Sequence, residues 1–376
     1  MQTKDFYYDL PPEQIAQVPL PQRDQSRLLY LSPDHRAYAD YRFRDLPQLL
    51  LPGDCLVMND TRVLPARLLG HKADTGIAVE CLLLERRDLR QWECLVKPGR
   101  RLRPGARIVF ASGELTGDIV DILPEGHRLI EFIYEGVFEA LLAEIGHVPL
   151  PPYIHTELSD EERYQTVYAS VEGSTAAPTA GLHFTTQLLN EIRADGIDIV
   201  NLTLHVGTGT FRPVSTERIE EHTMHSEYFS LTTSAAERIN AARARGGRVI
   251  ACGTTSARVL ESVCDADGCV RAEEGRTDIF IYPGYEIRAF DALITNFHLP
   301  QSTLLMLVAA LAGRQTILAA YRHAVASGYR FFSFGDAMFI ERARDPAVLS
   351  YNGPVELRPL AGQSGFPRIP EEGNDE

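Results

Sequence analysis

The chain has 376 residues and a formal net charge of −14, with 44% hydrophobic and 23% charged residues, which is typical of a globular protein with one large and one smaller domain. Charged residues interrupt the first turns and argue against a signal peptide, and the longest apolar stretch, residues 304–312, is far shorter than the roughly 20 residues that span a bilayer. We therefore expect a cytoplasmic protein with no membrane segment. Six cysteines without a C-x-x-C pair favour buried free thiols over disulfides or zinc ligands.

The first 60 residues contain one buried strand, 54–58, which ends at Asn59 and Asp60. From residue 67 to 135, short strands alternate with turns that contain Pro-Gly or Glu-Gly, and no helix of ten or more residues interrupts them. Antiparallel strands at this spacing predict a small β-barrel. The predicted strands are 78–84, 92–96, 107–110, 117–122 and 128–134.

Strands and helices alternate from about residue 163 to 339, a pattern typical of an α/β domain with a largely parallel sheet. Helices are predicted after Thr185, from a capping box at Ser234, after residue 255 and from Ser302, with a further helix at 316–327. The predicted strands are 197–205, 248–252, 278–282, 292–295 and 331–334.

The lone strand near residue 54 needs neighbouring strands, which the α/β domain would supply. The β-rich segment, which follows this strand and precedes the rest of that domain, is therefore predicted to be an insertion into it. We expect an α/β catalytic domain made of residues 1–60 and 150–345, an inserted β-barrel domain at 61–149, and a polar tail at 346–376 that is disordered. The proline-rich stretch from 146 to 153 would be the extended connector that returns the chain.

Polar side chains follow nearly every predicted strand of the α/β domain. Because ligands collect at the carboxyl ends of parallel strands, this clustering predicts an active site. The segments that follow the strands are 59–62, 206–212, 253–256, 295–301 and 335–336, with the small-residue run 173–184 beside them. That run either lets backbone approach a ligand or forms a flexible surface loop.

The glycines at 207 and 209 do not belong to a dinucleotide loop, because Phe211-Arg-Pro213 follows instead of a helix. The chain also lacks a phosphate-binding G-x-x-x-x-G-K-[ST] loop. Gly253-Thr-Thr-Ser256 opens a predicted helix and would suit an anion, or it is simply a capped turn.

Four histidines, His183, His205, His225 and His298, lie in or next to these segments, and at least one of them is a candidate proton carrier. His225 and Glu227 would share one face of a strand, so Glu227 could orient His225; a zinc site is the poorer alternative because no metal-ligand spacing supports it. Each histidine could instead be structural.

One basic stretch stands out in an acidic chain. Lys97, Arg100, Arg101 and Arg103 lie within one predicted turn. The turn is either a nucleic-acid contact or an ordinary solvated surface, and net charge alone argues weakly against a nucleic-acid partner.

These segments together resemble one family, the S-adenosylmethionine:tRNA ribosyltransferase-isomerases of queuosine biosynthesis, from residue 6 to 336. The resemblance is carried by Asn59-Asp-Thr-Arg-Val-Leu-Pro-Ala-Arg67, Pro149-Leu-Pro-Pro-Tyr-Ile154, Thr175-Ala-Ala-Pro-Thr-Ala-Gly-Leu-His-Phe184, Thr203-Leu-His-Val-Gly-Thr-Gly-Thr-Phe-Arg-Pro213, Met224-His-Ser-Glu227, Gly253-Thr-Thr-Ser-Ala-Arg258 and Thr295-Asn-Phe-His-Leu-Pro300.

The resemblance implies a barrel-like α/β catalytic domain with an inserted β-barrel. It also implies transfer of the ribosyl part of S-adenosylmethionine to 7-aminomethyl-7-deazaguanine at the tRNA wobble position, giving epoxyqueuosine, adenine and methionine. S-adenosylmethionine would be a consumed substrate, no metal or other cofactor would be needed, and a monomer is expected.

Roles follow from the demands of this reaction. A base, His205 or His225, would remove a proton beside the sulfonium. Phe184 and Phe211 could stack on adenine or face the sulfonium, and Arg258 could help the start of the helix at Gly253 take the methionine carboxylate. Asp60 and Asp336 are candidates for binding ribose hydroxyls or the deazaguanine. The remaining candidates are His183 as a catalytic group, Asn59, Arg62, Thr179, Thr208, Thr210, Thr254, Thr255, Asn296 and His298 as substrate-binding groups, and the basic turn as a tRNA contact.

Two other readings stay open. A non-catalytic RNA-binding module would predict apolar strand ends, which this chain lacks. A metal-dependent nucleotide hydrolase built on the histidines would be inhibited by chelators.

Overall fold

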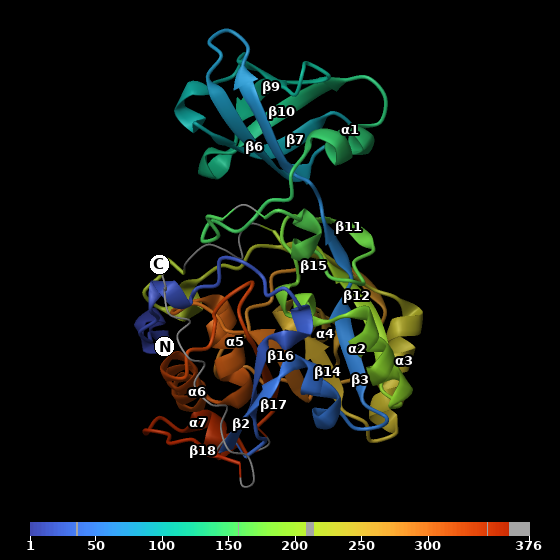
Figure 1. Ribbon diagram of the computed structural model, residues 1–376, viewed down its shortest axis with the longest axis vertical. Coiled ribbons are helices and arrows are strands. Elements are labelled where there is room, and N and C mark those ends of the chain that lie inside the picture. Colours follow the sequence, from blue (N-terminus) through green and yellow to red (C-terminus); the bar gives the residue numbers. More distant parts are fainter. Residues whose placement is uncertain (35–36, 157, 208–213, 344, 361–376) are drawn as a thin grey trace, which may run out of the picture.

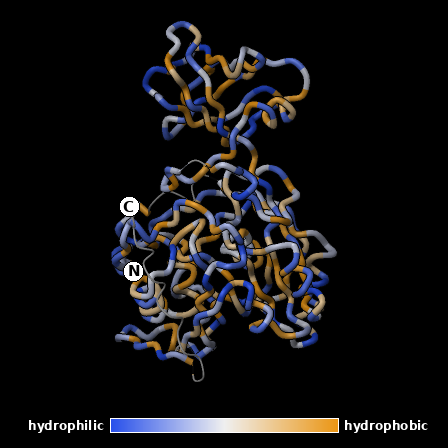
Figure 2. The backbone as a smooth tube through the Cα atoms, viewed as in Figure 1, coloured by the Kyte–Doolittle hydropathy of each residue, from blue (hydrophilic) through white to orange (hydrophobic). Residues whose placement is uncertain are grey.

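The computed structural model describes residues 1–34, 37–156, 158–207, 214–343 and 345–360. A large α/β domain carries a smaller β-barrel on a narrow neck (Figure 1). Hydrophobic residues run through the interior of both (Figure 2), so each has a core of its own.

The large domain is built on an open ten-stranded sheet. Its strands, in spatial order, are β15 (Glu273–Thr277), β13 (Glu227–Leu231), β12 (Asp198–Leu204), β3 (Cys55–Asn59), β14 (Val249–Cys252), β16 (Ala292–Asn296), β17 (Ala337–Glu341), β1 (Arg27–Leu31), β2 (Ala37–Arg42) and β18 (Arg358–Pro359). The four neighbours β12, β3, β14 and β16 are parallel. Strand β13 runs antiparallel to both of its neighbours, and β17 runs antiparallel to β16 but parallel to β1. The α/β class is confirmed, but the sheet is mixed rather than largely parallel.

Helices cover this sheet, and every residue of the central strand β3 is buried, which explains its unbroken apolar sequence. The helices of the large domain are α2 (Thr186–Ala194), α3 (Thr233–Ala244), α4 (Gly253–Val263), α5 (Thr303–Ala312), α6 (Arg314–Ala326) and α7 (Pro346–Ser350). Short 3-10 turns are η1 (Thr3–Phe6), η2 (Pro12–Gln14), η3 (Arg23–Gln25), η4 (Phe43–Leu49), η7 (Glu161–Tyr164), η8 (Thr179–His183) and η10 (Ile219–Glu221). No single helix among the described residues is long and apolar enough to cross a bilayer; α5 and α6 pass that test only as a pair, with a bend of 114° between them.

Thr185 and Ser302 cap α2 and α5 as the sequence predicts. The cap of α3 is Thr232, whose side chain accepts from the Ala235 amide, so the predicted capping box at Ser234 is wrong. Helix α3 therefore starts two residues earlier than a cap at Ser234 would place it.

Two predicted strands are also wrong. The strand predicted at 278–282 lies earlier, as β15, where it pairs with β13. The stretch 331–334 is apolar and aromatic like a strand, but Phe332 has a φ of 73°, which interrupts extended backbone, and the strand forms only at β17. The segment expected to be a disordered tail begins with α7, and β18 pairs with β2; residues 361–376 lie outside the described part of the chain.

The small domain is a closed antiparallel barrel in the order β10-β7-β6-β5-β8-β9, which confirms the inserted barrel. Its strands are β5 (Arg67–Lys72), β6 (Ala78–Arg86), β7 (Gln91–Lys97), β8 (Arg107–Phe110), β9 (Leu115–Ile122) and β10 (Arg128–Tyr134), with 3-10 turns η5 (Gly99–Arg101) and η6 (Pro124–Gly126). Helix α1 (Phe138–Ile145) packs Phe138 against Trp92 at one end.

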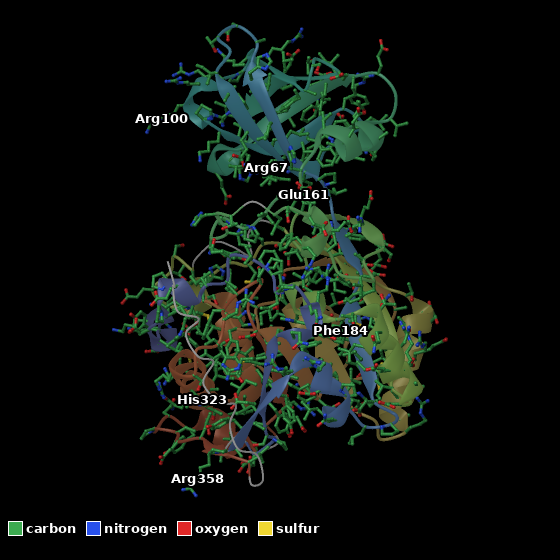
Figure 3. The ribbon with its side chains drawn as sticks, viewed as in Figure 1. Arg67, Arg100, Glu161, Phe184, His323 and Arg358 are labelled. Carbon is green, nitrogen blue, oxygen red and sulfur yellow. The ribbon has the colours of Figure 1, made fainter. Side chains whose placement is uncertain are left out.

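Two chain segments form the neck. The outgoing one contains β4 (Thr61–Val63), which pairs in parallel with β11 (Val171–Ser174). The backbones of Arg67 and His147 exchange two hydrogen bonds, of 3.0 and 2.9 Å, where the segments cross. Figure 3 shows Arg67 at the base of the barrel, with Glu161 below it on the large domain. The predicted domain boundaries at residues 60 and 150 remain predictions.

Candidate active site

Two cavities share one wall residue, Val206, just beyond β12. The first, here called the sheet pocket, has about 570 Å³ of empty space, part of which is open to solvent. It lies beyond β12, β14 and β16, where the sequence predicts a site. Its walls are Tyr153, Ala176, Ala177, Pro178, Thr179, Ala180, Val206, Gly253, Thr254, Thr255, Thr295, Asn296, Phe297, His298, Leu304, Phe332 and Ser333.

The second, here called the interdomain pocket, has about 1160 Å³ of space that opens to solvent. The barrel contributes Leu83, Leu84, Glu85, Arg86, Trp92, Glu93 and His127, and the neck contributes Leu64. The large domain contributes Gly173, Thr175, His205, Val206, Gly207, His225, Ser226, Glu227, Tyr228 and Arg276. The sequence gives no sign that these barrel residues would face the large domain, because that depends on how the two domains pack.

His205 is the best-placed proton acceptor. Its Nδ1 is 2.8 Å from the Thr61 hydroxyl, and its ring stacks on Tyr228 with centroids 5.4 Å apart. The Thr61 hydroxyl donates its own proton to the Val171 carbonyl, over 3.4 Å, so its oxygen accepts a hydrogen bond from the N–H at Nδ1. Nε2 then carries the lone pair. Burial lowers the pKa of His205, and the nearby Asp60 opposes that shift only in part, so the imidazole is neutral near pH 7.

Asp60 and Asn59 support this region from the end of β3. The Asp60 carboxylate accepts from Thr203 over 2.7 Å and from Ser170 over 3.3 Å, and burial raises its pKa. Asn59 is fully buried and bonds the Leu204 backbone and the Thr61 amide. Asp60 and Asn59 therefore orient β4 and β12, and neither lines a described cavity.

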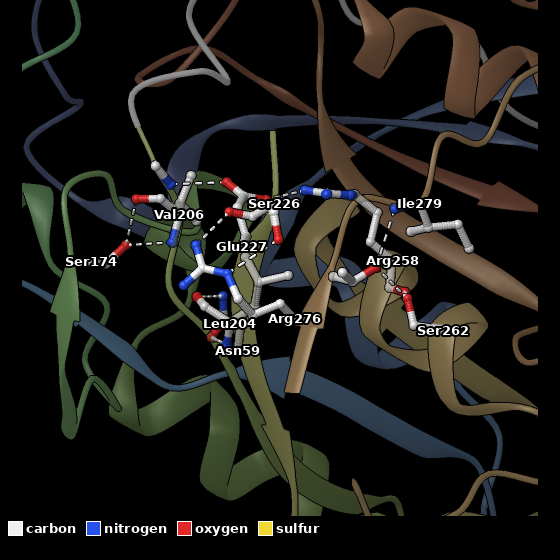
Figure 4. Close-up of polar contacts among 12 residues, drawn as sticks. Asn59, Ser174, Leu204, Val206, Ser226, Glu227, Arg258, Ser262, Arg276 and Ile279 are labelled. Atoms are coloured by element: carbon white, nitrogen blue, oxygen red, sulfur yellow. Dashed lines mark hydrogen bonds and ion pairs between the residues drawn. The ribbon is translucent and has the colours of Figure 1, made fainter. Parts of the chain in front are cut away.

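Glu227 pairs with Arg258 and also accepts from the Gly207 amide over 2.9 Å (Figure 4). Both members of the pair are buried. The predicted contact between Glu227 and His225 is therefore replaced by a pair with Arg258, because the carboxylate points to α4. His225 itself is exposed at the rim of the interdomain pocket.

The start of α4 faces the sheet pocket, as predicted. Thr254 and Thr255 line it together with Thr179 from η8. The Thr255 hydroxyl is buried and has no hydrogen-bond partner among the described residues. Backbone amides and hydroxyls at a helix start suit a carboxylate.

His183 and His298 are buried, and burial lowers the pKa of each to about 3. His183 bonds Ser26 and Asn296, and His298 bonds Thr295 over 3.0 Å. Both are neutral at physiological pH. Asn296 and His298 line the sheet pocket, whereas His183 lies behind Asn296 in a smaller cavity of about 300 Å³.

Three further predicted residues, Phe184, Asp336 and Arg62, also lie away from both cavities. Phe184 is fully buried against Phe43, so neither of its faces is open to adenine. Asp336 is buried and accepts from the backbone amides of Arg27 and Arg330, each over 2.8 Å. Arg62 pairs with Glu162 near the neck. Thr208, Thr210 and Phe211 fall outside the described residues.

The basic turn is exposed and well anchored. Arg128, buried beneath it, donates to the carbonyls of Gly99, Leu102 and Gly126 and so fixes its shape. The side chains of Lys97, Arg100, Arg101 and Arg103 are exposed and have no ion-pair partner among the described residues. Figure 3 shows Arg100 extending from the side of the barrel.

The sequence missed Ser26, Tyr153, Phe332, Ser333 and Arg276. Ser26 is remote in sequence from every predicted segment, and the two residues at 332 and 333 were assigned to a strand. Only Tyr153, inside the proline-rich connector, lay in a stretch already singled out. Among the described residues, no group of three His, Cys, Asp or Glu side chains is arranged to hold a metal ion.

The model of the family described as "Queuosine biosynthesis protein" matches residues 3–340. An S-adenosylmethionine:tRNA ribosyltransferase-isomerase of Symbiobacterium thermophilum is 59% identical over 340 residues, 90% of this chain and 100% of the relative. One of Acetivibrio thermocellus is 56% identical over 341 residues, 91% of this chain and 100% of the relative. The crystal structure of an S-adenosylmethionine tRNA ribosyltransferase from Thermotoga maritima is 36% identical, covers 89% of this chain and 99% of its own, and superposes with a TM-score of 0.51. The chain belongs to the queuosine biosynthesis protein family.

Proposed function

We propose that this protein is an S-adenosylmethionine:tRNA ribosyltransferase-isomerase. It transfers and isomerises the ribosyl group of S-adenosylmethionine onto 7-aminomethyl-7-deazaguanine at the tRNA wobble position. The products are epoxyqueuosine in tRNA, adenine and methionine. Its relatives carry that name over nearly this whole chain. The observation that supports it best is the pair of cavities that share Val206, one at the end of the sheet and one open between the domains.

The sheet pocket would hold S-adenosylmethionine. The start of α4, with Thr254 and Thr255, would receive the methionine carboxylate, and the apolar walls at Pro178 and Phe332 would take the base. The interdomain pocket would hold the modified nucleotide, whose aminomethyl group must reach the sugar where the cavities meet.

The chemistry needs proton carriers at that junction. The neutral amine replaces adenine on the sugar carbon that carried it, and adenine leaves with the electron pair of that bond. A base removes the ribose proton next to the sulfonium, and the electron pair left on that carbon forms a carbon–carbon bond to the amine-bearing carbon, which releases the ring oxygen. The released oxygen then closes to an epoxide on the carbon next to sulfur as methionine departs with the electron pair of the carbon–sulfur bond. We assign the base to Nε2 of His205, because it is neutral and lines the interdomain pocket next to Val206. These steps are proton transfers and displacements, and they call for no metal or redox cofactor.

The basic turn, Lys97 to Arg103, is the proposed tRNA contact on the barrel. A local cluster of exposed cations attracts the phosphate backbone even though the whole chain is acidic. We further propose that a monomer acts in the cytoplasm.

The test is to incubate the protein with S-adenosylmethionine and tRNA bearing the aminomethyl base. Free adenine and methionine should appear in equal amounts, and only with that tRNA. Unmodified tRNA with guanine at the wobble position is the matched control. Release of neither product refutes the proposal, and activity abolished by chelators points instead to a metal-dependent hydrolase.

A further inference from the structure

Asn296 lies at the end of β16 with one polar atom unused. Its Oδ1 is buried, has no hydrogen-bond partner among the described residues, and belongs to a side chain that lines the sheet pocket. Asn296 is only 3% exposed. An unpaired buried acceptor costs about 1–3 kcal/mol, so such an atom in a pocket wall calls for a donor on the ligand.

A neighbouring carbonyl fixes which way this amide faces. The Asn296 amide nitrogen is 3.2 Å from the Phe332 carbonyl oxygen, and a carbonyl can only accept. The amide group must therefore turn its NH₂ toward Phe332. Phe332 has a φ of 73°, unusual for an aromatic residue and worth about 1–3 kcal/mol of strain, and such outliers gather at ligand sites.

The second N–H of the same amide then determines which ring nitrogen of His183 carries the proton. It lies 3.1 Å from His183 Nε2, which must accept because both nitrogen protons of Asn296 are donated outward. The neutral imidazole carries its proton on Nδ1 and donates it to the Ser26 hydroxyl, 2.7 Å away. That hydroxyl donates in turn to the Arg23 carbonyl over 3.4 Å. Each group therefore donates to the next, from Asn296 to His183, from His183 to Ser26 and from Ser26 to the Arg23 carbonyl. The Oδ1 atom of Asn296 is left as an acceptor.

We infer that Ser26 and His183 are positioning residues that hold Asn296 Oδ1 toward the exocyclic amino group of adenine in S-adenosylmethionine. This inference rests on the proposed function and adds to it the selection of adenine over other purines in the ribosyl donor. The walls beside Asn296 at Pro178, Phe297 and Phe332 are apolar, which suits the face of a purine. A 6-keto purine presents an oxygen at the same place and would meet Oδ1 acceptor to acceptor.

The test compares S-adenosylmethionine with S-inosylmethionine as ribosyl donor, using kcat/KM for each with the same tRNA. The unmodified enzyme should favour the amino compound by at least about 100-fold. Asn296→Ala should reduce that ratio to a few-fold. His183→Ala leaves the amide free to flip and should reduce the ratio at least 10-fold, and Ser26→Ala should have a smaller effect in the same direction.

His183→Gln is the conservative rescue, because a glutamine oxygen can accept from Asn296 in place of Nε2; it should restore most of the ratio. His323→Ala, far from the pockets beside Tyr38, is the control and should leave the ratio unchanged. Melting temperatures identify variants that fail to fold, and if His183→Ala is one, Ser26→Ala and His183→Gln carry the test.

Three outcomes overturn the inference. A ratio unchanged in Asn296→Ala shows that Oδ1 does not read the base. Equal losses with both donors show that Asn296 meets a sugar hydroxyl instead. A loss in Asn296→Ala with none in the His183 and Ser26 variants shows that the two do not position it. Turnover with S-adenosylmethionine in each of these cases leaves the proposed function standing, whereas an enzyme that uses neither donor refutes both.

Discussion

Gly173 of β11 lies directly against the imidazole of His205. A methyl group on Gly173 would come within 2.6 Å of His205 Nε2, the atom assigned as the base. The φ of Gly173 is 146°, which side-chain-bearing residues rarely adopt. Because Gly173 has no side chain, the space beside Nε2 stays unfilled, and both residues line the interdomain pocket.

Gly173→Ala should lower kcat by about 100-fold or more, because the added methyl displaces the imidazole from the reacting atoms. Single-turnover release of adenine measures the step directly. Gly113→Ala is the matched control: its φ of 107° is also unfavourable, yet nothing lies within 4 Å of the added methyl. Similar rates for the two variants would show that strain rather than the clash matters.

His205→Ala should lower turnover by about 100-fold or more, and His225→Ala should have a much smaller effect because His225 is exposed at the rim. Adenine release under saturating substrates distinguishes the two. Near-normal rates in both variants would remove histidine as the base.

The pH profile carries a separate prediction. The base works in its neutral form, so activity is lost as pH falls through the pKa of His205, which burial holds below its usual 6.5. Asp60 raises that pKa, so Asp60→Asn should move the acid limb of kcat/KM to still lower pH. A limb that stays in place, or moves upward, would contradict the assignment.

The buried ion pair of Glu227 and Arg258 stabilises the folded protein. Arg258→Met removes one member of a buried ion pair from the Glu227 carboxylate and should lower the free energy of unfolding by about 3–5 kcal/mol. Adding Glu227→Gln to that variant should recover most of the loss. Chemical denaturation measures both, and Arg62→Met, whose partner Glu162 is exposed, should cost no more than about 1 kcal/mol. Equal losses at the two arginines would contradict the burial argument.

Reversing the charge of Arg100, Arg101 and Arg103 should raise the KM for tRNA and flatten its dependence on salt, with little change in kcat. Arg245→Glu, exposed after α3 on the large domain, is the control. An unchanged KM and salt slope would mean that the turn is only a solvated surface.

The sequence predicted the site best for residues that directly follow parallel strands, because the carboxyl ends of such strands lie at the same edge of the sheet. Thr254, Asn296 and His298 lie together for that reason. That relationship could not rank the histidines, because the open ring of His205 and the enclosed ring of His183 follow from packing between distant segments.

Other features depended on tertiary structure alone. Phe184 follows a pocket segment but turns into the core, as large aromatic side chains do when an apolar space is available. The barrel residues Glu93 and His127 reach the interdomain pocket only because the neck sets the angle between two domains. No local pattern of residues encodes that angle.

The neck has a mechanical consequence. Thr61, which holds His205 Nδ1, belongs to β4, and β4 continues within a few residues into the first strand of the barrel. A force that a docked tRNA exerts on the barrel would thus be transmitted through β5 and the short link to β4, and so to the residue that orients the base. Deleting the barrel would remove a substrate-binding surface. It would also break the chain connection through β4 that holds Thr61, and with it the His205 imidazole, in place.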